Sequence, residues 1–312
     1  MGKMYRISGT YCASLTPFME DYSINKKLLL EHCNNLLSQN IDGIAIFGTT
    51  GEANSLSIEE KLDAINFLID NKIDSKKLLP GTGLNSIKDT VFFTKAVAKI
   101  NVRGVLVLPP TYYKNISSEG LIDYYVRVIE EVGETNLHYL LYHFPQMSNV
   151  NIDLNVIEKL LYKYPNNIVG IKDSSGDIDN MLKMIKIFND FSVFSGSDSL
   201  ALKVVKNGGA GAITAVSNIS GQLLSFIINN CRDESKVPKL IEFQKLQEEI
   251  RSTVFHHQPV SSLKAFMSIK EDNPEWNRVL PPLVTLQDPS NNKTIISLLE
   301  FTKKMDILLS NS

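Results

Sequence analysis

Cysteine is scarce in this sequence, with three residues in 312. Cys12, Cys33 and Cys231 are far apart and odd in number, which excludes a disulfide framework and a paired-cysteine metal site. We therefore expect buried thiols in a reducing compartment and a cytoplasmic location. The five histidines do not cluster at ligand spacing, so we expect no metal.

An excess of charge of either sign is also lacking, because 32 Lys and Arg residues face 34 Asp and Glu residues, for a net charge of -2. Such a chain presents no basic field to nucleic acid phosphates or anionic lipids. No stretch approaches the roughly 18 apolar residues of a membrane span, and residues 1–10 lack the apolar segment of a signal peptide. We expect no nucleic-acid partner and no membrane attachment.

What the sequence does contain is a repeated alternation of short apolar runs and amphipathic segments. Some amphipathic segments begin with helix-start signals, such as Ser57 three residues before Glu60 and Ser117 three residues before Gly120. Successive runs begin roughly 25 to 35 residues apart, the length of one strand-helix unit. Eight runs are predicted to be strands: 10–16, 43–47, 77–81, 104–108, 138–142, 168–172, 192–195 and 210–214.

Eight consecutive strand-helix units predict an α/β protein with a (β/α)8 TIM barrel, rather than an open doubly wound sheet. The glycine-rich dinucleotide-binding motif of the open sheet is missing after the first predicted strand. We expect residues 1–220 to form the barrel with the catalytic site. Residues 221–312 should add the last barrel helix and a C-terminal helical extension, with helices at 237–255, 260–269 and 293–309.

Chemistry in such a barrel lies at the C-terminal ends of the strands. The second predicted strand is followed there by Gly48-Thr49-Thr50-Gly51. Glycines allow a sharp turn that points several N–H groups at one spot, and two threonine hydroxyls add donors for a small carboxylate or phosphate. A tight turn without a ligand is the alternative.

The sixth predicted strand ends in Lys172, which shares a face with Gly170 and is followed by Asp173. An amine is a nucleophile only when neutral, and a desolvated barrel mouth favours the neutral form. The alternative is a lysine that reaches solvent or pairs with Asp173. The fifth predicted strand ends in Tyr142, whose phenol can transfer protons beside Lys172.

Further polar groups follow other predicted strands. Tyr112 and Tyr113 come after the fourth, Ser197 follows the seventh, and glycines at 208, 209 and 211 precede or open the eighth. Glycines near the last two strands commonly bind phosphate in these barrels, so a phosphorylated sugar remains an alternative for the substrate.

Together these motifs resemble the dihydrodipicolinate synthase / N-acetylneuraminate lyase family of pyruvate-dependent class I aldolases. The resemblance covers nearly the whole chain and implies a reaction without metal or other cofactor. The matching stretches are Gly48-Thr49-Thr50-Gly51-Glu52, Tyr112-Tyr113 with Ser118-Glu119-Gly120, Tyr142-x-x-Pro145, Gly170-Ile171-Lys172-Asp173, Ser195-Gly196-Ser197-Asp198 and Gly211-Ala212-Ile213.

The resemblance also implies roles at the matching positions. Lys172 would form a Schiff base with the ketone of pyruvate or a longer 2-oxo acid. Tyr142 would relay protons, with Thr49 and Tyr113 completing its hydrogen-bond chain. In many relatives the tyrosine matching Tyr113 comes from a neighbouring subunit, so we expect a homodimer or homotetramer. The residues expected at the substrate are Thr50, Gly48, Gly51, Ile213, Ser197, Ser217 and Met147.

The partner of pyruvate is suggested by a departure from the family pattern. In the synthases of lysine biosynthesis an arginine grips the carboxylate of aspartate semialdehyde, and Met147 stands in its place here. The stretch 215–218 looks more like the 2-keto-3-deoxy-sugar-acid aldolases, in which small hydroxyl residues meet a polyol. We therefore expect an aldolase of the 2-keto-3-deoxygluconate type that acts on pyruvate and a small aldehyde.

Three alternatives remain open. The first is a 4-hydroxy-tetrahydrodipicolinate (dihydrodipicolinate) synthase, which condenses pyruvate with aspartate semialdehyde, and the second is an N-acetylneuraminate lyase. A non-enzymatic sensor of 2-oxo acids on the same barrel is the third. An arginine from another loop, such as Arg103, Arg251 or Arg278, would restore recognition of the semialdehyde.

Overall fold

The computed structural model describes residues 6–133 and 136–310, so residues 1–5 of the N-terminal segment 1–10, which is predicted to lack a signal peptide, lie outside the described residues. The chain divides into two compact units. Unit 1 comprises Met1–Ser8 and Asp74–Ile213, and unit 2 comprises Gly9–Ile73 and Thr214–Ser312. None of the helices in the described ranges is long and apolar enough to cross a bilayer.

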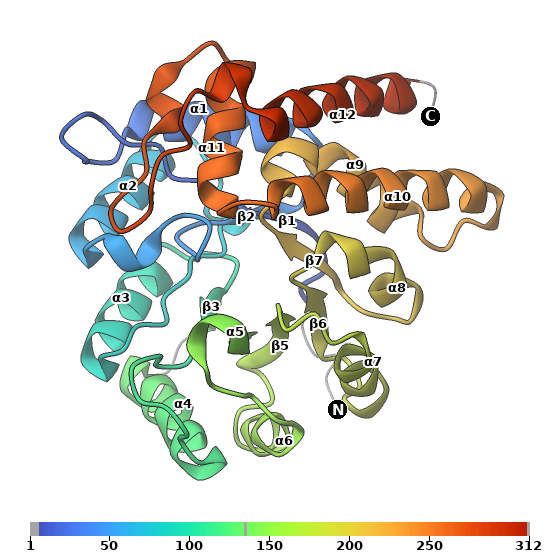
Figure 1. Cartoon of the computed structure of the whole chain (residues 1–312). Helices are drawn as coiled ribbons and strands as arrows, with labels where there is room; N and C mark the ends of the chain where they lie inside the picture. Colours follow the sequence, from blue (N-terminus) through green and yellow to red (C-terminus); the bar gives the residue numbers. More distant parts are fainter. Residues whose placement is uncertain (1–5, 134–135, 311–312) are drawn as a thin grey trace. The chain divides into compact units, whose positions relative to one another are not determined.

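Unit 1 is a succession of parallel strands and helices (Figure 1). Neighbouring strands pair in the order β3, β4, β5, β6 and β7, all in parallel. The strands are β3 (Val105–Val107), β4 (Tyr139–His143), β5 (Ile168–Asp173), β6 (Ser192–Ser195) and β7 (Gly211–Thr214, in unit 1 as far as Ile213). The helices are α3 (Ile87–Lys99), α4 (Ser118–Val132), α5 (Pro145–Ser148), α6 (Leu154–Lys163), α7 (Ile178–Ile187) and α8 (Ala201–Lys206).

The prediction of a strand at residues 77–81 of unit 1 is wrong. Ser75–Lys77 forms a 3-10 turn, and only Gly81 makes a bridge, to Leu106 of β3. The segment still runs beside β3, because the Leu106 N–H donates to the Pro80 carbonyl at 2.9 Å. Pro80 has no N–H to donate in return, which shortens the ladder.

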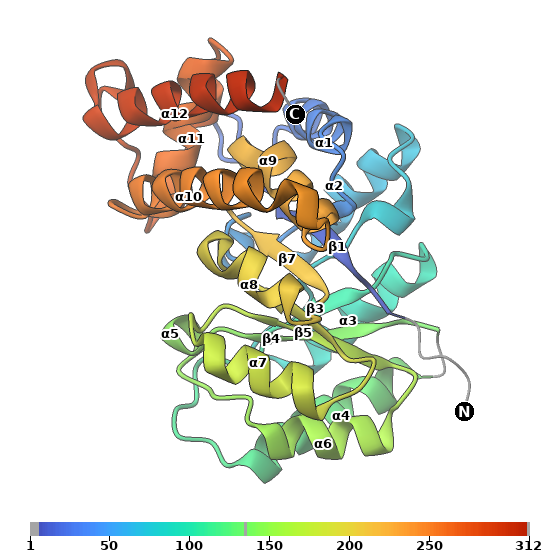
Figure 2. The ribbon, with the colours of Figure 1, turned by 90° about the vertical axis from the view of Figure 1, so that its right-hand side faces the viewer.

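Unit 2 contains the parallel pair β1 (Gly9–Ala13) and β2 (Gly43–Ala45), in register from Tyr11 opposite Gly43. Its C-terminal helices α10, α11 and α12 pack against one another (Figure 2). These three confirm the helices predicted at 237–255, 260–269 and 293–309 to within one residue at either end. The helices are α1 (Lys26–Ser38), α2 (Ile58–Asp70), α9 (Ser217–Asn230), α10 (Val237–Val254), α11 (Pro259–Lys270) and α12 (Lys293–Ser310).

The predicted helix starts are confirmed in both units. Ser57 forms a capping box with Glu60 at the start of α2, since its side chain accepts the Glu60 N–H and the Glu60 carboxylate accepts the Ser57 N–H. Ser117 caps α4 by accepting the Gly120 N–H at 3.2 Å. Such caps satisfy N–H groups that have no partner inside the helix.

Candidate active site

Lys172 lies at the end of β5, whose six residues are all buried. Its side chain is 5% exposed, so it does not reach out to bulk solvent. Gly170 lets β5 approach β6 closely, since a Cβ there would lie 2.3 Å from the Ser192 carbonyl oxygen. The glycine before the lysine therefore serves the strand pairing rather than simply leaving space in the interior.

Asp173, the next residue, does not pair with Lys172. Its carboxylate accepts hydrogen bonds from the N–H and hydroxyl of Ser175, at 2.8 and 2.5 Å, and from the amide of Asn180 at 2.9 Å. Strand alternation turns the two side chains to opposite faces. In the described ranges no carboxylate lies within ion-pair distance of the Lys172 amine, so no such contact favours its charged form.

Tyr142 lies directly beside Lys172, because β4 and β5 are paired with these two residues in register. The Lys172 Nζ lies 4.4 Å from the centre of the Tyr142 ring, and the tyrosine is 5% exposed. Phe144 stacks on the ring of Tyr142 at 5.9 Å between centroids and limits its movement. The structure therefore places Tyr142 and Lys172 side by side, as the order of the strands predicts.

His143 follows Tyr142 and is buried on the other face of β4. Burial lowers the pKa of the imidazole, which outweighs the opposing effect of Asp173 and Asp177. The Ile152 N–H points at His143 Nδ1 from 3.3 Å, a bond that the neutral ring accepts. A neutral His143 adds no positive charge next to the Tyr142–Lys172 pair.

The loop after β3 presents Tyr112 and Tyr113, which are 77% and 70% exposed and meet edge to face at 5.5 Å. Asn85 fixes the loop, since its side-chain oxygen accepts the N–H groups of Thr111 and Tyr112 at 2.7 and 3.2 Å. Tyr113 is therefore held at the surface of unit 1. An exposed pair of rings is the kind of surface that a second subunit covers.

Two other predicted site residues of unit 1 are buried. Ser197 is 8% exposed, and its hydroxyl donates to the Ser199 hydroxyl at 3.4 Å. Its backbone is held by Ser195, whose hydroxyl donates to the Ser197 carbonyl and accepts the Ser197 N–H. Ile213 on β7 is fully buried. Ser197 follows β6, which pairs with β5, and Ile213 lies on β7, which pairs with the other edge of β6.

In unit 2 the Gly48-Thr49-Thr50-Gly51 turn is bracketed by two non-glycine residues with left-handed backbone, Phe47 at φ 56° and Glu52 at φ 55°. Each costs roughly 1 to 3 kcal/mol, a strain that persists only where the surroundings enforce it. Hydrogen bonds within the turn help to hold this backbone. The Gly51 and Ala53 N–H groups both donate to the Gly48 carbonyl, at 3.1 and 3.3 Å.

Thr50 is the residue of this turn whose polar groups stay available. In the ranges that the structure describes, neither its N–H nor its hydroxyl has a hydrogen-bond partner. Gly51 beneath it is packed tightly, with a hypothetical Cβ 3.0 Å from the Ser14 carbonyl oxygen, and its own carbonyl accepts the Thr16 hydroxyl at 2.8 Å. The turn thus offers an N–H and a hydroxyl from a fixed backbone, which is what a carboxylate needs.

Ser217, also in unit 2, is fully buried. Its hydroxyl donates to the Thr214 carbonyl at 2.6 Å and lies 3.1 Å from the Thr214 hydroxyl. It offers a ligand no free proton, so its expected role in binding a sugar hydroxyl receives no support from its bonding.

Met147 lies on α5 and is 55% exposed. The arginines considered as substitutes for a carboxylate grip are engaged elsewhere. In unit 2, Arg278 donates to the Phe18 carbonyl at 3.2 Å and pairs with Glu20, while Arg251 covers the ring of Phe255. In unit 1, Arg103 interacts with His138, one residue before β4 begins and thus at the opposite end of that strand from Tyr142.

Sequence reasoning missed a lysine beside α5. Lys114 Nζ bonds to the Thr111 carbonyl and lies 3.5 Å from the carbonyl of Ser148, the residue after Met147. Its position 34 residues earlier in the chain gave no signal of this proximity. The structure therefore brings one positive charge to the segment in which the sequence shows none.

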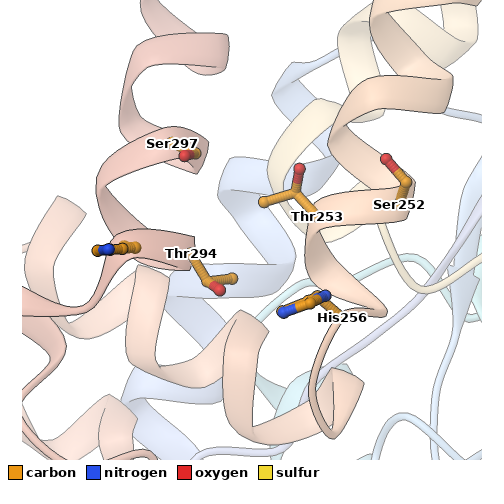
Figure 3. A pocket seen from close by; sticks show the side chains of 6 residues that line it. Ser252, Thr253, His256, Thr294 and Ser297 are labelled. Atoms are coloured by element: carbon orange, nitrogen blue, oxygen red, sulfur yellow. The ribbon is translucent and has the colours of Figure 1, made fainter.

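A polar hollow of about 380 Å³ lies between α10 and α12 in unit 2 (Figure 3). The hydroxyls of Ser252 and Thr253 are both bonded to the Glu249 carbonyl, at 2.9 Å. None of its lining residues was predicted as a site residue. They are Ser252, Thr253, His256, Lys293, Thr294 and Ser297.

The buried lysine on a strand end, the neighbouring phenol and the donor turn are features of a class I aldolase. The model of the dihydrodipicolinate synthetase family matches residues 6–299, so this chain belongs to that family of pyruvate-dependent lyases and aldolases. It is 37% identical over 219 residues to the 4-hydroxy-tetrahydrodipicolinate synthase of Listeria welshimeri, covering 69% of this chain and 73% of the relative.

Solved structures agree with this membership. The 4-hydroxy-tetrahydrodipicolinate synthase of Methylacidiphilum fumariolicum SolV is 28% identical, with a TM-score of 0.85 over 96% of this chain and 97% of that one. A 2-keto-3-deoxygluconate aldolase variant of Sulfolobus solfataricus is 24% identical, with a TM-score of 0.83 over 97% and 98%, which shows a shared fold. The predicted (β/α)8 barrel with a C-terminal helical extension is thereby confirmed. The boundary at residue 220 stays a prediction.

Proposed function

We propose that this protein is a pyruvate-dependent aldolase in which Lys172 forms the imine. The observation that carries the proposal is the buried Lys172 amine, beside the Tyr142 ring and without a carboxylate contact in the described ranges. In a chain of this family, such a lysine is placed for attack on a ketone. A sensor that binds 2-oxo acids without turnover needs neither the amine nor the phenol.

The chemistry follows from the imine. The Lys172 amine adds to the C2 ketone of pyruvate and water leaves, which gives a protonated imine. Loss of a proton from the methyl carbon yields a neutral enamine, and this carbon attacks the aldehyde to form the new C–C bond. Water then hydrolyses the imine and frees Lys172. Cleavage of a 2-oxo acid is the same sequence in reverse.

The other site residues receive roles from the family resemblance. Tyr142 transfers the protons, with Thr49 and Tyr113 as its hydrogen-bond partners. Thr50, with Gly48 and Gly51 shaping the turn, binds the pyruvate carboxylate, a role supported by the unpartnered N–H and hydroxyl of Thr50 in the described ranges.

We also propose a homodimer or homotetramer in the cytoplasm. The support for assembly is Tyr113, which is 70% exposed although the proposed chemistry needs it next to Tyr142 in a water-poor site. A neighbouring subunit that contributes its own Tyr113 would complete the proton relay in each copy.

The aldehyde partner that we propose first is a hydroxylated one, as in a 2-keto-3-deoxygluconate aldolase. Its support is Met147, because a thioether gives a second carboxylate no charged partner and desolvating that carboxylate is costly. Sugar hydroxyls need only neutral partners, and two are Ser197 in the turn after β6 and Gln146 on α5, which follows β4.

The second candidate is a 4-hydroxy-tetrahydrodipicolinate synthase. Two observations favour it: the Listeria welshimeri synthase is 37% identical to this chain, and Lys114 lies beside Ser148 on α5. A lysine provides a point charge for a carboxylate, although it lacks the two-pronged geometry of arginine.

Borohydride reduction in the presence of pyruvate tests the imine. We expect one covalent adduct, mapped by peptide mass spectrometry to Lys172, and no adduct in Lys172→Arg, which keeps the charge but not a titratable amine. Lys163→Met, which removes an exposed lysine paired with Glu130, is the control and should label normally. Labelling at another lysine would refute the assignment of Lys172.

The substrate is tested by measuring both reactions on one preparation. We expect kcat/KM for cleavage of 2-keto-3-deoxygluconate to exceed that for condensation with aspartate semialdehyde by at least about tenfold, or about 1.4 kcal/mol. The opposite preference would assign the second candidate and show that Met147 is no marker of specificity. Release of pyruvate from N-acetylneuraminate belongs in the same panel.

A further inference from the structure

Glu52 and Lys264 form a buried ion pair inside unit 2. Their side chains are 1% and 0% exposed, and the Lys264 Nζ lies 2.5 Å from Glu52 Oε1. The second carboxylate oxygen accepts the Leu280 N–H at 2.7 Å. Both carboxylate oxygens of Glu52 thus accept a hydrogen bond. The pair links α11 of the C-terminal extension to Glu52, the residue that directly follows the Gly48–Gly51 turn.

In residues 6–133 and 136–310, Glu52 is the one carboxylate that pairs with the Lys264 amine. Its Nζ also donates to the Arg278 carbonyl at 2.7 Å and lies 4.0 Å from the centre of the Phe18 ring. The Arg278 guanidinium is directed away, toward the Phe18 carbonyl and Glu20. Next to Glu52 in the chain, the Ala53 carbonyl accepts a hydrogen bond from Lys61 of α2 at 3.2 Å.

Two buried lysines therefore hold the last residues of the turn from two helices. Glu52 has a left-handed backbone at φ 55°, a conformation that is costly for a residue with a side chain. Its carboxylate is fixed by α11 and by the Leu280 N–H, so the strained backbone cannot relax without breaking a buried ion pair.

We propose that Glu52 and Lys264 are positioning residues for the carboxylate-binding turn. The α11 ammonium holds Glu52, and Glu52 holds the backbone from which Thr50 presents its N–H and hydroxyl to pyruvate. The proposal rests on the proposed function for the identity of the ligand. The mechanical part, that Lys264 orders the turn, is independent of the ligand.

The charge state of Lys264 gives this role a pH signature. Burial lowers the pKa of the Lys264 ammonium from 10.5 to about 8, against the attraction of Glu52. Above this pH the pair becomes a neutral amine beside a carboxylate, and the hydrogen bond loses its charge assistance. The groups that contact Lys264 are the Glu52 carboxylate, the Arg278 carbonyl and the Phe18 ring. Lys61 bonds to the Ala53 carbonyl, next to Glu52, and burial lowers its pKa to about 8 as well.

The mechanical part is tested by amide hydrogen exchange without substrate. The N–H groups of Gly51, Glu52 and Ala53 are bonded within the turn and should be protected in the parent protein. We expect Lys264→Met to speed their exchange at least tenfold while the amides of α4 in unit 1 keep their rates. Unchanged exchange in the turn would overturn the proposal. Lys163→Met, with its exposed ion pair, is the matched control.

The functional part is tested by pyruvate kinetics on the same variants. We expect Lys264→Met and Glu52→Gln to raise the KM for pyruvate at least tenfold with kcat within threefold, because loss of carboxylate binding affects ground state and transition state alike. The ratio of variant to parent KM should fall as the pH is raised through about 8. A merely structural pair would lower the melting temperature and leave KM and this ratio unchanged.

The double variant Glu52→Gln/Lys264→Met is the control that separates a loss of stability from a loss of positioning. It removes both charges, so it should recover thermal stability while KM for pyruvate stays raised. Recovery of the parental KM would overturn the positioning role. If pyruvate and borohydride fail to label Lys172 in the parent, the proposed function fails, and the exchange rates still decide whether Lys264 orders the turn.

Discussion

The buried ion pair predicts how the stability of this protein changes with pH. We compare the parent with Glu52→Gln/Lys264→Met, which lacks both charges. Burial lowers the pKa of Lys264 from 10.5 to about 8 in the folded state. Between these two pH values the unfolded chain binds a proton that the folded chain does not, so the free energy of unfolding of the parent rises with pH.

The magnitude follows from the shift. Each pH unit of difference corresponds to about 1.4 kcal/mol, so a change from 10.5 to about 8 corresponds to roughly 3 kcal/mol of stability gained across that range. The Lys264 side chain is fully buried, so solvent screening removes little of this. Below about pH 8 the cost of burying the ammonium is fully present, and the double variant avoids it. Near pH 7 we expect the double variant to equal or exceed the parent in stability.

Urea unfolding followed by circular dichroism at pH 7, 8, 9 and 10 measures this difference directly. The single variant Lys264→Met should lose about 3 to 5 kcal/mol at pH 7, because it leaves the Glu52 carboxylate buried without a partner. Lys163→Met, which breaks an exposed pair with Glu130, should follow the parent within about 1 kcal/mol. A difference between parent and double variant that stays flat or falls from pH 8 to 10 would refute the reasoning.

Three further predictions concern the site in unit 1. Tyr142→Phe should still give the borohydride adduct while kcat falls about 10²- to 10⁴-fold, the range for a positioned acid or base; a parental kcat would mean that Tyr142 only packs. Gly170→Ala places a Cβ 2.3 Å from the Ser192 carbonyl oxygen and should cost roughly 1 to 3 kcal/mol in urea unfolding, whereas unchanged stability would show that β5 and β6 separate easily. Lys114→Met should raise the KM for aspartate semialdehyde at least about tenfold if its charge holds that carboxylate, with the KM for glyceraldehyde as the internal control, and equal effects on both substrates would exclude a charge contact.

The strand-end chemistry could be predicted from the sequence because it depends on short-range rules. Alternation along β5 sets Lys172 and Asp173 on opposite faces, and chain order pairs β4 with β5, so Tyr142 and Lys172 meet. The capping box at Ser57 is likewise a pattern within four residues. Where the sequence prediction failed, at 77–81, a local feature was overlooked: Pro80 cannot donate to a ladder.

The pairs that join distant segments carry no such pattern. Lys264 lies on α11 among apolar residues, 212 positions after Glu52, and no pattern in the sequence signals that the two charges meet. In the sequence, Glu52 stands out only as the last residue of the Gly48–Glu52 motif. A buried charge is affordable only with a partner, so two unexplained charged residues in otherwise apolar surroundings are the signal that a search for such pairs would use.

The position of Lys114 explains why the sequence predicts the type of reaction more directly than it predicts the aldehyde substrate. Met147 predicts a neutral substrate because no lysine or arginine lies between Tyr142 and Asn151. The segment after β4 is not the sole source of charge there, because the loop after β3 brings the Lys114 ammonium to 3.5 Å from the carbonyl of Ser148, the residue after Met147. Imine chemistry needs one lysine fixed by a strand, whereas recognition of an aldehyde sums contributions from several loops. The charge at that entrance must therefore be counted over loops and not along the chain.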